Sequence, residues 1–77
     1  DIGIRLEKKP TTTKEQQEFI IESLPGIGPS TAKSLLNKLI SIEKIFSASS
    51  KELEETEGVG SKRAKEIRRI IKENYEN

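Results

Sequence analysis

A short pattern built on two glycines occurs twice in this chain of 77 residues, and its repetition strongly constrains the fold. The first copy is Leu24-Pro25-Gly26-Ile27-Gly28-Pro29, and Gly26 is followed 32 residues later by Gly58 of the second copy, Glu57-Gly58-Val59-Gly60. The same offset relates Ile27 to Val59, Gly28 to Gly60, Ala32 to Ala64, Lys33 to Lys65, and Leu35 to Ile67. A repeat that keeps glycines, apolar residues and a lysine in register predicts a duplicated structural unit.

Each copy is typical of a helix that ends, a tight hairpin, and a second helix that begins. Pro25 disfavours a helical conformation in the residue before it, so we expect the first helix to end there. Gly26 and Gly28 allow backbone angles that other residues resist, and neither has a side chain that could block a close approach. Pro29 suits the first position of the next helix, where its missing N–H group is no loss. Ile27, between the glycines, is expected to fill the core.

The helix start after each hairpin is a candidate anion site, because free N–H groups meet the positive end of the helix dipole there. A Gly-x-Gly turn near a proline is more often only a turn, so a duplicated hairpin without a ligand stays open as an interpretation. The second start also carries Lys62, Arg63 and Lys65, at the end of the helix where the dipole disfavours cations. A bound anion such as phosphate would account for that placement.

The composition limits the functions open to the chain. It contains no Cys and no His, so thiol nucleophiles, disulfides, zinc–cysteine sites and the usual general base near neutral pH are excluded. We therefore expect no catalytic residue, no metal and no cofactor, and an enzyme is the least favoured interpretation. No apolar run approaches the roughly 20 residues of a membrane-spanning helix.

Two parts of the chain are expected to differ in order. Because the chain begins with Asp1 and not with Met, we expect it to be a piece of a longer protein. Residues 1–11 would then be a flexible linker from a missing upstream domain, and residues 12–77 would form one domain.

The pattern over residues 12–77 predicts about five short helices and no strong strand, which makes the domain all-α. We expect helices over residues 14–23, 29–39, 42–46, 50–56 and 61–74. The caps expected at three of these helix starts are Thr12 with Glu15 (or Thr13 with Gln16), Ser41, and Ser49 with Glu52.

Apolar residues at helical spacing predict the core. In the first helix we expect Phe19, Ile20 and Leu24 to form the apolar face, with Ile21 beside it. The residues of the later helices that are expected to face the core are Ala32, Leu35, Leu36, Leu39 and Ile40, then Ile42, Ile45, Phe46 and Leu53, then Ala64, Ile67, Ile70 and Ile71.

These residues resemble the tandem helix-hairpin-helix family, in which two such motifs and a connecting helix form one DNA-binding unit. The resemblance covers residues 24–71, and the second copy departs from it with Thr56 and Glu57 in place of Leu24 and Pro25. It implies that hairpin amides hold DNA phosphates, with added charge from lysines and arginine and added hydroxyl donors. The DNA-binding residues implied in this way are Gly26, Ile27, Gly28, Ser30, Thr31, Lys33, Gly58, Val59, Gly60, Lys62, Arg63 and Lys65.

Within that family, three stretches of the chain are similar to the C-terminal domain of archaeal XPF-type nucleases and Hef. They are residues 12–19, 45–49 and 64–71. The resemblance implies a cytoplasmic, nucleoid-associated, non-catalytic module of a structure-specific DNA repair nuclease. The module would form a homodimer, bind the backbone of fork or flap DNA without sequence specificity, and have no membrane partner. Phe19 and Ile20 are candidate dimer contacts, and Tyr75, the only tyrosine, is a candidate interface anchor.

Two alternatives to this interpretation stay open. Glu57 beside the second hairpin and the net charge of only +1 are compatible with a pure dimerisation or protein-interaction domain. Much of residues 25–60 is also similar to the C-terminal domain of UvrC-type nucleases.

Overall fold

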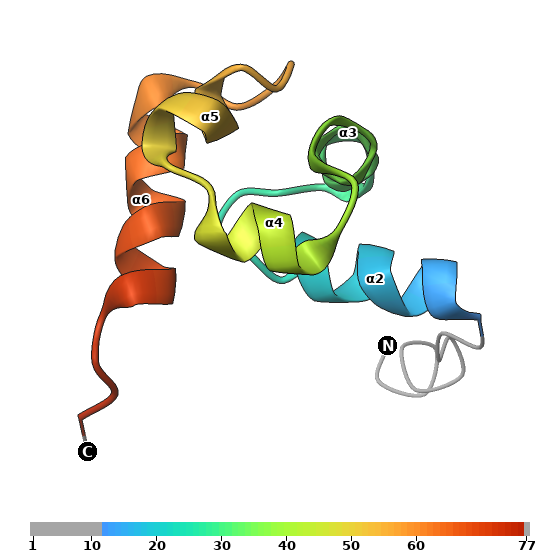
Figure 1. The fold of residues 1–77 in the computed structure, drawn as a ribbon, viewed down its shortest axis with the longest axis horizontal. Coiled ribbons are helices and arrows are strands. Elements are labelled where there is room, and N and C mark those ends of the chain that lie inside the picture. The colour runs from blue at the N-terminus through green and yellow to red at the C-terminus, as the bar shows by residue number, and fades with distance from the viewer. Residues whose placement is uncertain (1–11, 77) are drawn as a thin grey trace, which may run out of the picture.

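Figure 1 shows the computed structural model, which describes residues 12–76 of the chain. Within this range the chain forms five α-helices and no strand, so the predicted all-α fold is confirmed. The helices are α2 (Thr13–Glu22), α3 (Pro29–Leu39), α4 (Ile42–Ser47), α5 (Ser50–Glu54) and α6 (Ser61–Lys72). None of these helices is long and apolar enough to cross a membrane. The linker predicted over residues 1–11 lies outside the described range.

Side-chain caps define three of the helix starts, as predicted. Thr12 Oγ1 accepts a hydrogen bond from the Glu15 N–H at 3.0 Å, and Glu15 Oε1 accepts one from the Thr12 N–H at 3.2 Å. Ser49 and Glu52 form the same reciprocal pair at the start of α5, at 3.1 and 2.8 Å. Ser41 Oγ caps α4 through one bond. Each cap satisfies a donor that the helix leaves unpaired, which is why capping residues predict helix starts well.

The helices form two units that correspond to the sequence repeat. α2 packs against α3 across the first hairpin (residues 24–28), and α5 packs against α6 across the second hairpin (residues 56–60). α4 follows α3 and packs against it, joining the units (Figure 1). Two helices end two residues earlier than predicted: α5 ends at Glu54 and α6 ends at Lys72. In contrast, α4 extends one residue further than predicted.

One apolar core lies between the two units. Ile27 and Val59, the residues between the glycines of the two hairpins, are both buried in it as predicted. The buried apolar residues of the described range are Ile21, Leu24, Ile27, Ala32, Leu35, Ile45, Ala48, Leu53, Val59, Ala64 and Ile67, with Leu36, Leu39, Ile42 and Ile71 packed partly against them.

The apolar face predicted for α2 is confirmed for Leu24 but not for Phe19 and Ile20. Ile21 is fully buried, whereas Phe19 and Ile20 are 53% and 42% exposed. Residues three apart lie on one side of a helix, so Ile21 and Leu24 face the core together. Phe19 and Ile20 precede Ile21 and point to the flanks of that face, where the single chain leaves them uncovered.

Three other apolar residues that were expected to face the core are exposed. Ile40 is 69% exposed because it follows the last residue of α3 with a φ of 79°, which turns the chain outward. Ile70 is 47% exposed, since α6 presents its core side through Ala64 and Ile67 and Ile70 lies at the edge of that side. Phe46 is 37% exposed, near the C-terminal end of α4, where Ile45 takes the core position.

Candidate functional site

The starts of α3 and α6 differ from the other three helix starts in the described range. Their N-cap residues are Gly28 and Gly60, which offer no side chain to cap the helix. Neither helix has an acidic residue in its first turn, whereas α2, α4 and α5 each have one. The positive ends of the α3 and α6 dipoles are therefore not compensated by an acidic residue in their own first turns.

Backbone N–H groups remain available at both of these starts. The first helical bonds run from the Ala32 N–H to the Gly28 carbonyl and from the Ala64 N–H to the Gly60 carbonyl, both at 2.9 Å. The residues before Ala32 and Ala64 in each first turn have no acceptor for their N–H within residues 12–76. These residues are Ser30 and Thr31 in α3, and Ser61, Lys62 and Arg63 in α6. Both starts have the geometry of an anion site.

The four hairpin glycines serve two different purposes. Gly26 and Gly58 have φ values of 69° and 92°, a backbone conformation that residues other than glycine rarely adopt. Gly28 has an extended backbone that any residue adopts, so the unusual angles that the sequence suggested there are not found. A Cβ atom on Gly28 or Gly60 would meet nothing within 4 Å, which leaves open space directly in front of each helix start.

The residues between the glycines are not available as donors. The Ile27 N–H donates to the Leu24 carbonyl at 3.1 Å, and the Val59 N–H donates to the Thr56 carbonyl at 3.0 Å. With their side chains in the core as well, Ile27 and Val59 hold the hairpin in shape. Ile27 and Val59 can therefore contribute to an anion site only indirectly, because they help to position the adjacent helix starts.

The two hairpins contact each other in a reciprocal way that the sequence analysis missed. The Arg63 guanidinium, from the start of α6, occupies the space that a Cβ atom on Gly26 would take. Thr31 Oγ1, from the start of α3, lies 3.0 Å from the Cβ position of Gly58. Thr31 and Arg63 are themselves related by the repeat offset of 32 residues. A side chain from each helix start thus lies against the positive-φ glycine of the other hairpin.

Only some of the cationic side chains predicted to support phosphate binding lie close together at a hairpin. Lys62 lines a surface hollow of about 620 Å³ at the second hairpin, together with Gly58, Gly60, Ser61, Arg63 and Glu66. Arg63 Nη1 also forms an ion pair with Glu66 Oε1 at 3.1 Å. Lys33 lines a separate groove between α2 and α3, and Lys65 is exposed further along α6.

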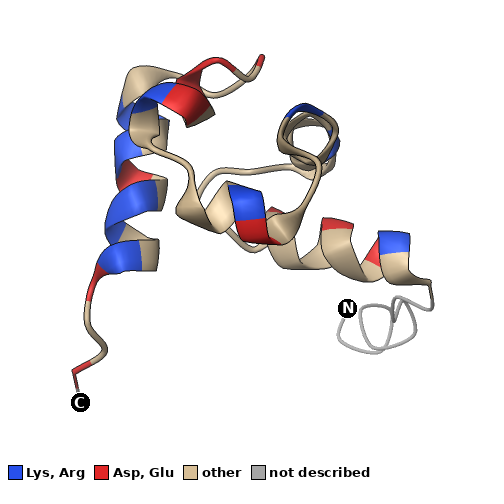
Figure 2. Ribbon diagram, viewed as in Figure 1, with Lys and Arg blue, Asp and Glu red and all other residues tan. Residues whose placement is uncertain are grey.

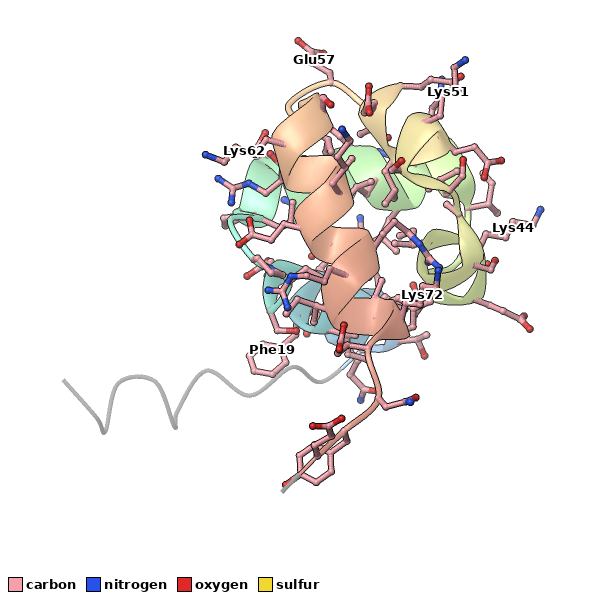
Figure 3. All side chains as sticks on the ribbon, turned by 90° about the vertical axis from the view of Figure 1, so that its left-hand side faces the viewer. Phe19, Lys44, Lys51, Glu57, Lys62 and Lys72 are labelled. Carbon is pink, nitrogen blue, oxygen red and sulfur yellow. The ribbon has the colours of Figure 1, made fainter. Side chains whose placement is uncertain are left out.

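The second hairpin carries two polar residues where the first has Leu24 and Pro25. Thr56 is 3% exposed, and its Oγ1 is the one buried side-chain oxygen or nitrogen without a hydrogen-bond partner in the described range. Glu57 is exposed at the tip of the hairpin, where Figure 3 shows its side chain pointing away from the helices.

The predicted dimer contacts are all exposed in the single chain. Phe19 and Ile20 lie on the uncovered flank of α2, and Figure 3 shows Phe19 at the edge of the molecule. Tyr75 is 89% exposed, in the segment after α6 that runs away from the helices (Figure 1). Within the described range no group of three or more acidic side chains is placed to hold a metal ion.

Comparison with known proteins links this arrangement to a family. A family model described as a SAM-like helix-hairpin-helix tandem matches residues 19–73. The MJ1505 protein of Methanocaldococcus jannaschii, named as an ATP-dependent RNA helicase, is 44% identical over 97% of this chain. The 3′-flap repair endonuclease Xpf of Saccharolobus solfataricus is 34% identical over 96% of this chain. The UvrABC system protein C of Haloarcula marismortui is 35% identical over 74% of it.

A solved structure, XPF from Aeropyrum pernix in complex with DNA, has a similar fold, with a TM-score of 0.84, 37% identity and 95% of this chain covered. This chain spans only part of each of these proteins: 10% of the helicase and of the UvrABC protein, 31% of the Saccharolobus endonuclease and 36% of the Aeropyrum XPF chain.

Proposed function

The chain belongs to the SAM-like helix-hairpin-helix tandem family, and on this basis we propose that it is a DNA-binding and dimerisation module of a structure-specific repair nuclease. The module itself is non-catalytic and binds the phosphate backbone of fork or flap DNA. Relatives named for XPF cover nearly the whole chain, whereas the UvrABC relative covers less of it, which favours the XPF type over the UvrC type.

The observation that carries the proposal is the pair of uncapped helix starts at Gly28 and Gly60. Each start offers free amides to a phosphate, and the Thr31 and Arg63 side chains, one from each start, lie against the positive-φ glycine of the other hairpin. Contacts of this kind position a protein on DNA without reading bases. The module therefore recognises backbone shape and not sequence.

A serine at the N-cap would compete with DNA for the same amides. Gly60 has φ −86° and ψ 175°, close to the φ −72° and ψ 163° of Ser49, which caps α5. In Gly60→Ser the new hydroxyl is expected to accept from the Arg63 N–H, so the free energy of unfolding rises by a few tenths of a kcal/mol. Affinity for duplex DNA should fall about tenfold, because a donor to phosphate is lost. Thermal unfolding and fluorescence anisotropy measure the two effects.

Gly60→Ala is the matched control for this experiment, since its Cβ atom enters the same open space without offering an acceptor. It should bind DNA better than Gly60→Ser. For the wild-type chain, neutralising about four phosphates predicts that log affinity falls against log salt with a slope of about −3 to −4. A serine variant that binds DNA like the wild type would exclude the amides of α6 as the site. A flat salt response would favour the pure protein-interaction domain, the alternative that Glu57 and the low net charge suggest.

The proposed dimer uses the apolar residues that the single chain leaves exposed. Phe19 and Ile20 form a flank of α2 that a second copy can cover, and Tyr75 is free to insert into a partner. Tyr75→Ala is expected to raise the dimer dissociation constant by about tenfold or more, since a buried aromatic side chain is lost. Sedimentation over a concentration series measures this constant. A wild-type chain that stays monomeric at high micromolar concentration contradicts the dimer, and an unchanged dimer in the variant contradicts only the role of Tyr75.

A further inference from the structure

The outward side of α6 carries a row of cations that we call the cationic stripe: Lys62, Lys65, Arg69 and Lys72. Their spacing of three, four and three residues places them on one side of the helix, and all four are exposed. Figure 2 shows Lys and Arg along the length of α6, and Figure 3 views this helix from outside, with Lys62 near its start and Lys72 near its end. The residues of α3 and its C-cap at the equivalent repeat positions are Ser30, Lys33, Asn37 and Ile40, so the stripe belongs to the second unit alone.

The stripe is not used by the fold. The other two cations of α6 are engaged: Arg63 pairs with Glu66, and Arg68 Nη1 donates to the Phe46 carbonyl at 2.6 Å. The four stripe residues have no ion pair or side-chain hydrogen bond within residues 12–76. The helix dipole favours Arg69 and Lys72 in the last turn but disfavours Lys62 in the first. Neither internal contacts nor the dipole therefore account for the whole row.

The stripe also faces a different direction from the hairpin amides. The free N–H groups of a helix start point along the axis beyond the helix end, whereas the stripe points sideways from it. From Lys62 to Lys72 the stripe extends about 15 Å back from that end, at 1.5 Å per residue. A straight duplex that crosses the end of α6 at Gly60, perpendicular to the helix axis, would leave Arg69 and Lys72 uncovered. A backbone that diverges from this duplex could follow the stripe.

We propose that Lys65, Arg69 and Lys72 bind the sugar–phosphate backbone of a second arm of a branched DNA, while the hairpins hold the first arm. This inference rests on the proposed DNA-binding function and gives a physical basis for a preference for branched substrates. It assigns that preference to a single copy of the module, independent of dimerisation. Lys62, at the junction of the hairpin site and the stripe, contacts the backbone where the two arms meet.

The test uses the 77-residue chain and the double substitution Arg69→Gln with Lys72→Gln. The matched control, Lys44→Gln with Lys51→Gln, removes the same charge from α4 and α5 and leaves α6 unchanged. Anisotropy titrations against a linear duplex, a three-way junction with duplex arms, and a fork with single-stranded arms give affinities and salt slopes. Circular dichroism checks that each variant keeps its helices.

We expect the stripe variant to lose about tenfold or more in affinity for a branched substrate and less than about twofold for the linear duplex, since about two phosphate contacts are lost only on the former. The salt slope should become shallower by about 1.8 if the second arm is a duplex, or by about 1.4 if it is single-stranded. The control should bind all three substrates like the wild type. The single substitutions should give smaller losses of the same kind, which guards against a folding defect in the double variant.

Several outcomes would overturn the inference. Equal losses on the linear duplex and the junction would place the stripe on the first arm, and no loss on either would exclude the stripe from DNA binding. If the control variant lost as much affinity for the branched substrate as the stripe variant, the loss would be explained by the change in net charge and not by the position of the stripe. In all three cases wild-type binding to the linear duplex would leave the proposed function standing. If the wild type failed to bind that duplex, the proposed function would fail as well.

Discussion

Gly26 in the first hairpin and Gly58 in the second adopt the same positive-φ conformation, yet the residues around them differ in polarity and charge. The first hairpin is preceded by Leu24 and Pro25, and the helix after it starts with neutral side chains. The second is preceded by Thr56 and Glu57, and its helix starts with Lys62 and Arg63. The turn, the buried residue and the uncapped helix start are thus duplicated, whereas the charge is not.

This difference suggests that the two hairpins contribute differently to phosphate binding. Backbone geometry supplies the amides in both hairpins, so the repeat keeps the residues that shape the turn. Charge, which sets the strength and salt dependence of binding to phosphates, is concentrated in the second unit. The reciprocal contacts of Thr31 and Arg63 then couple the neutral hairpin to the charged one. Three predictions can break or sharpen this comparison.

The largest effect is expected at the positive-φ glycines. Gly58→Ala puts a Cβ atom 3.0 Å from Thr31 Oγ1 in a left-handed conformation, so the free energy of unfolding should fall by about 2 kcal/mol. Gly26→Ala meets the mobile end of Arg63 instead and should cost about 1 kcal/mol. Urea denaturation of both variants measures the difference. Equal losses would mean that the two hairpins are held together symmetrically.

A smaller effect of opposite sign is expected at Thr56. Its buried Oγ1 has no partner within the described range, whereas the equivalent Leu24 has no polar side-chain atom to satisfy. Thr56→Val removes the unpaired hydroxyl at nearly constant shape and should raise the free energy of unfolding by about 1 kcal/mol. Denaturation against urea tests this, with Thr31→Val as a control in which the hydroxyl is only partly buried. A destabilised Thr56→Val variant would show that the hydroxyl has a partner such as water.

The smallest effect concerns Glu57, the acidic residue at the tip of the second hairpin. Glu57→Gln removes a negative charge beside a proposed phosphate site, so affinity for duplex DNA should rise about twofold at low salt and less at high salt. Stability should change by no more than about 0.5 kcal/mol, since the side chain is exposed. Glu54→Gln, in α5, is the matched control. A rise of the same size in the control would indicate a general charge effect.

Much of this fold follows from the sequence, because the residues that begin and end its helices act locally. Thr12, Ser41 and Ser49 cap the helices they were predicted to cap, and Pro29 begins α3 as expected. The repeat predicted that Ile27 and Val59 would be buried between their glycines. It also predicted an anion site at Gly28 and Gly60, which stays a prediction, and both residues are N-caps without a capping side chain.

Only the tertiary structure decided which side of each helix meets the core. Periodicity relates residues within one helix but does not say where the neighbouring helices lie, which is why Ile21 is buried in place of Phe19 and Ile20. Ile40 is exposed because the chain leaves the helix there. The contacts of Arg63 with Gly26 and of Thr31 with Gly58 join residues that are distant in the chain, so the way in which α3 and α6 approach each other determines them. The sequence determined two helix starts without a capping side chain, and packing between the two units placed Thr31 and Arg63 from these starts against the glycines of the opposite hairpins.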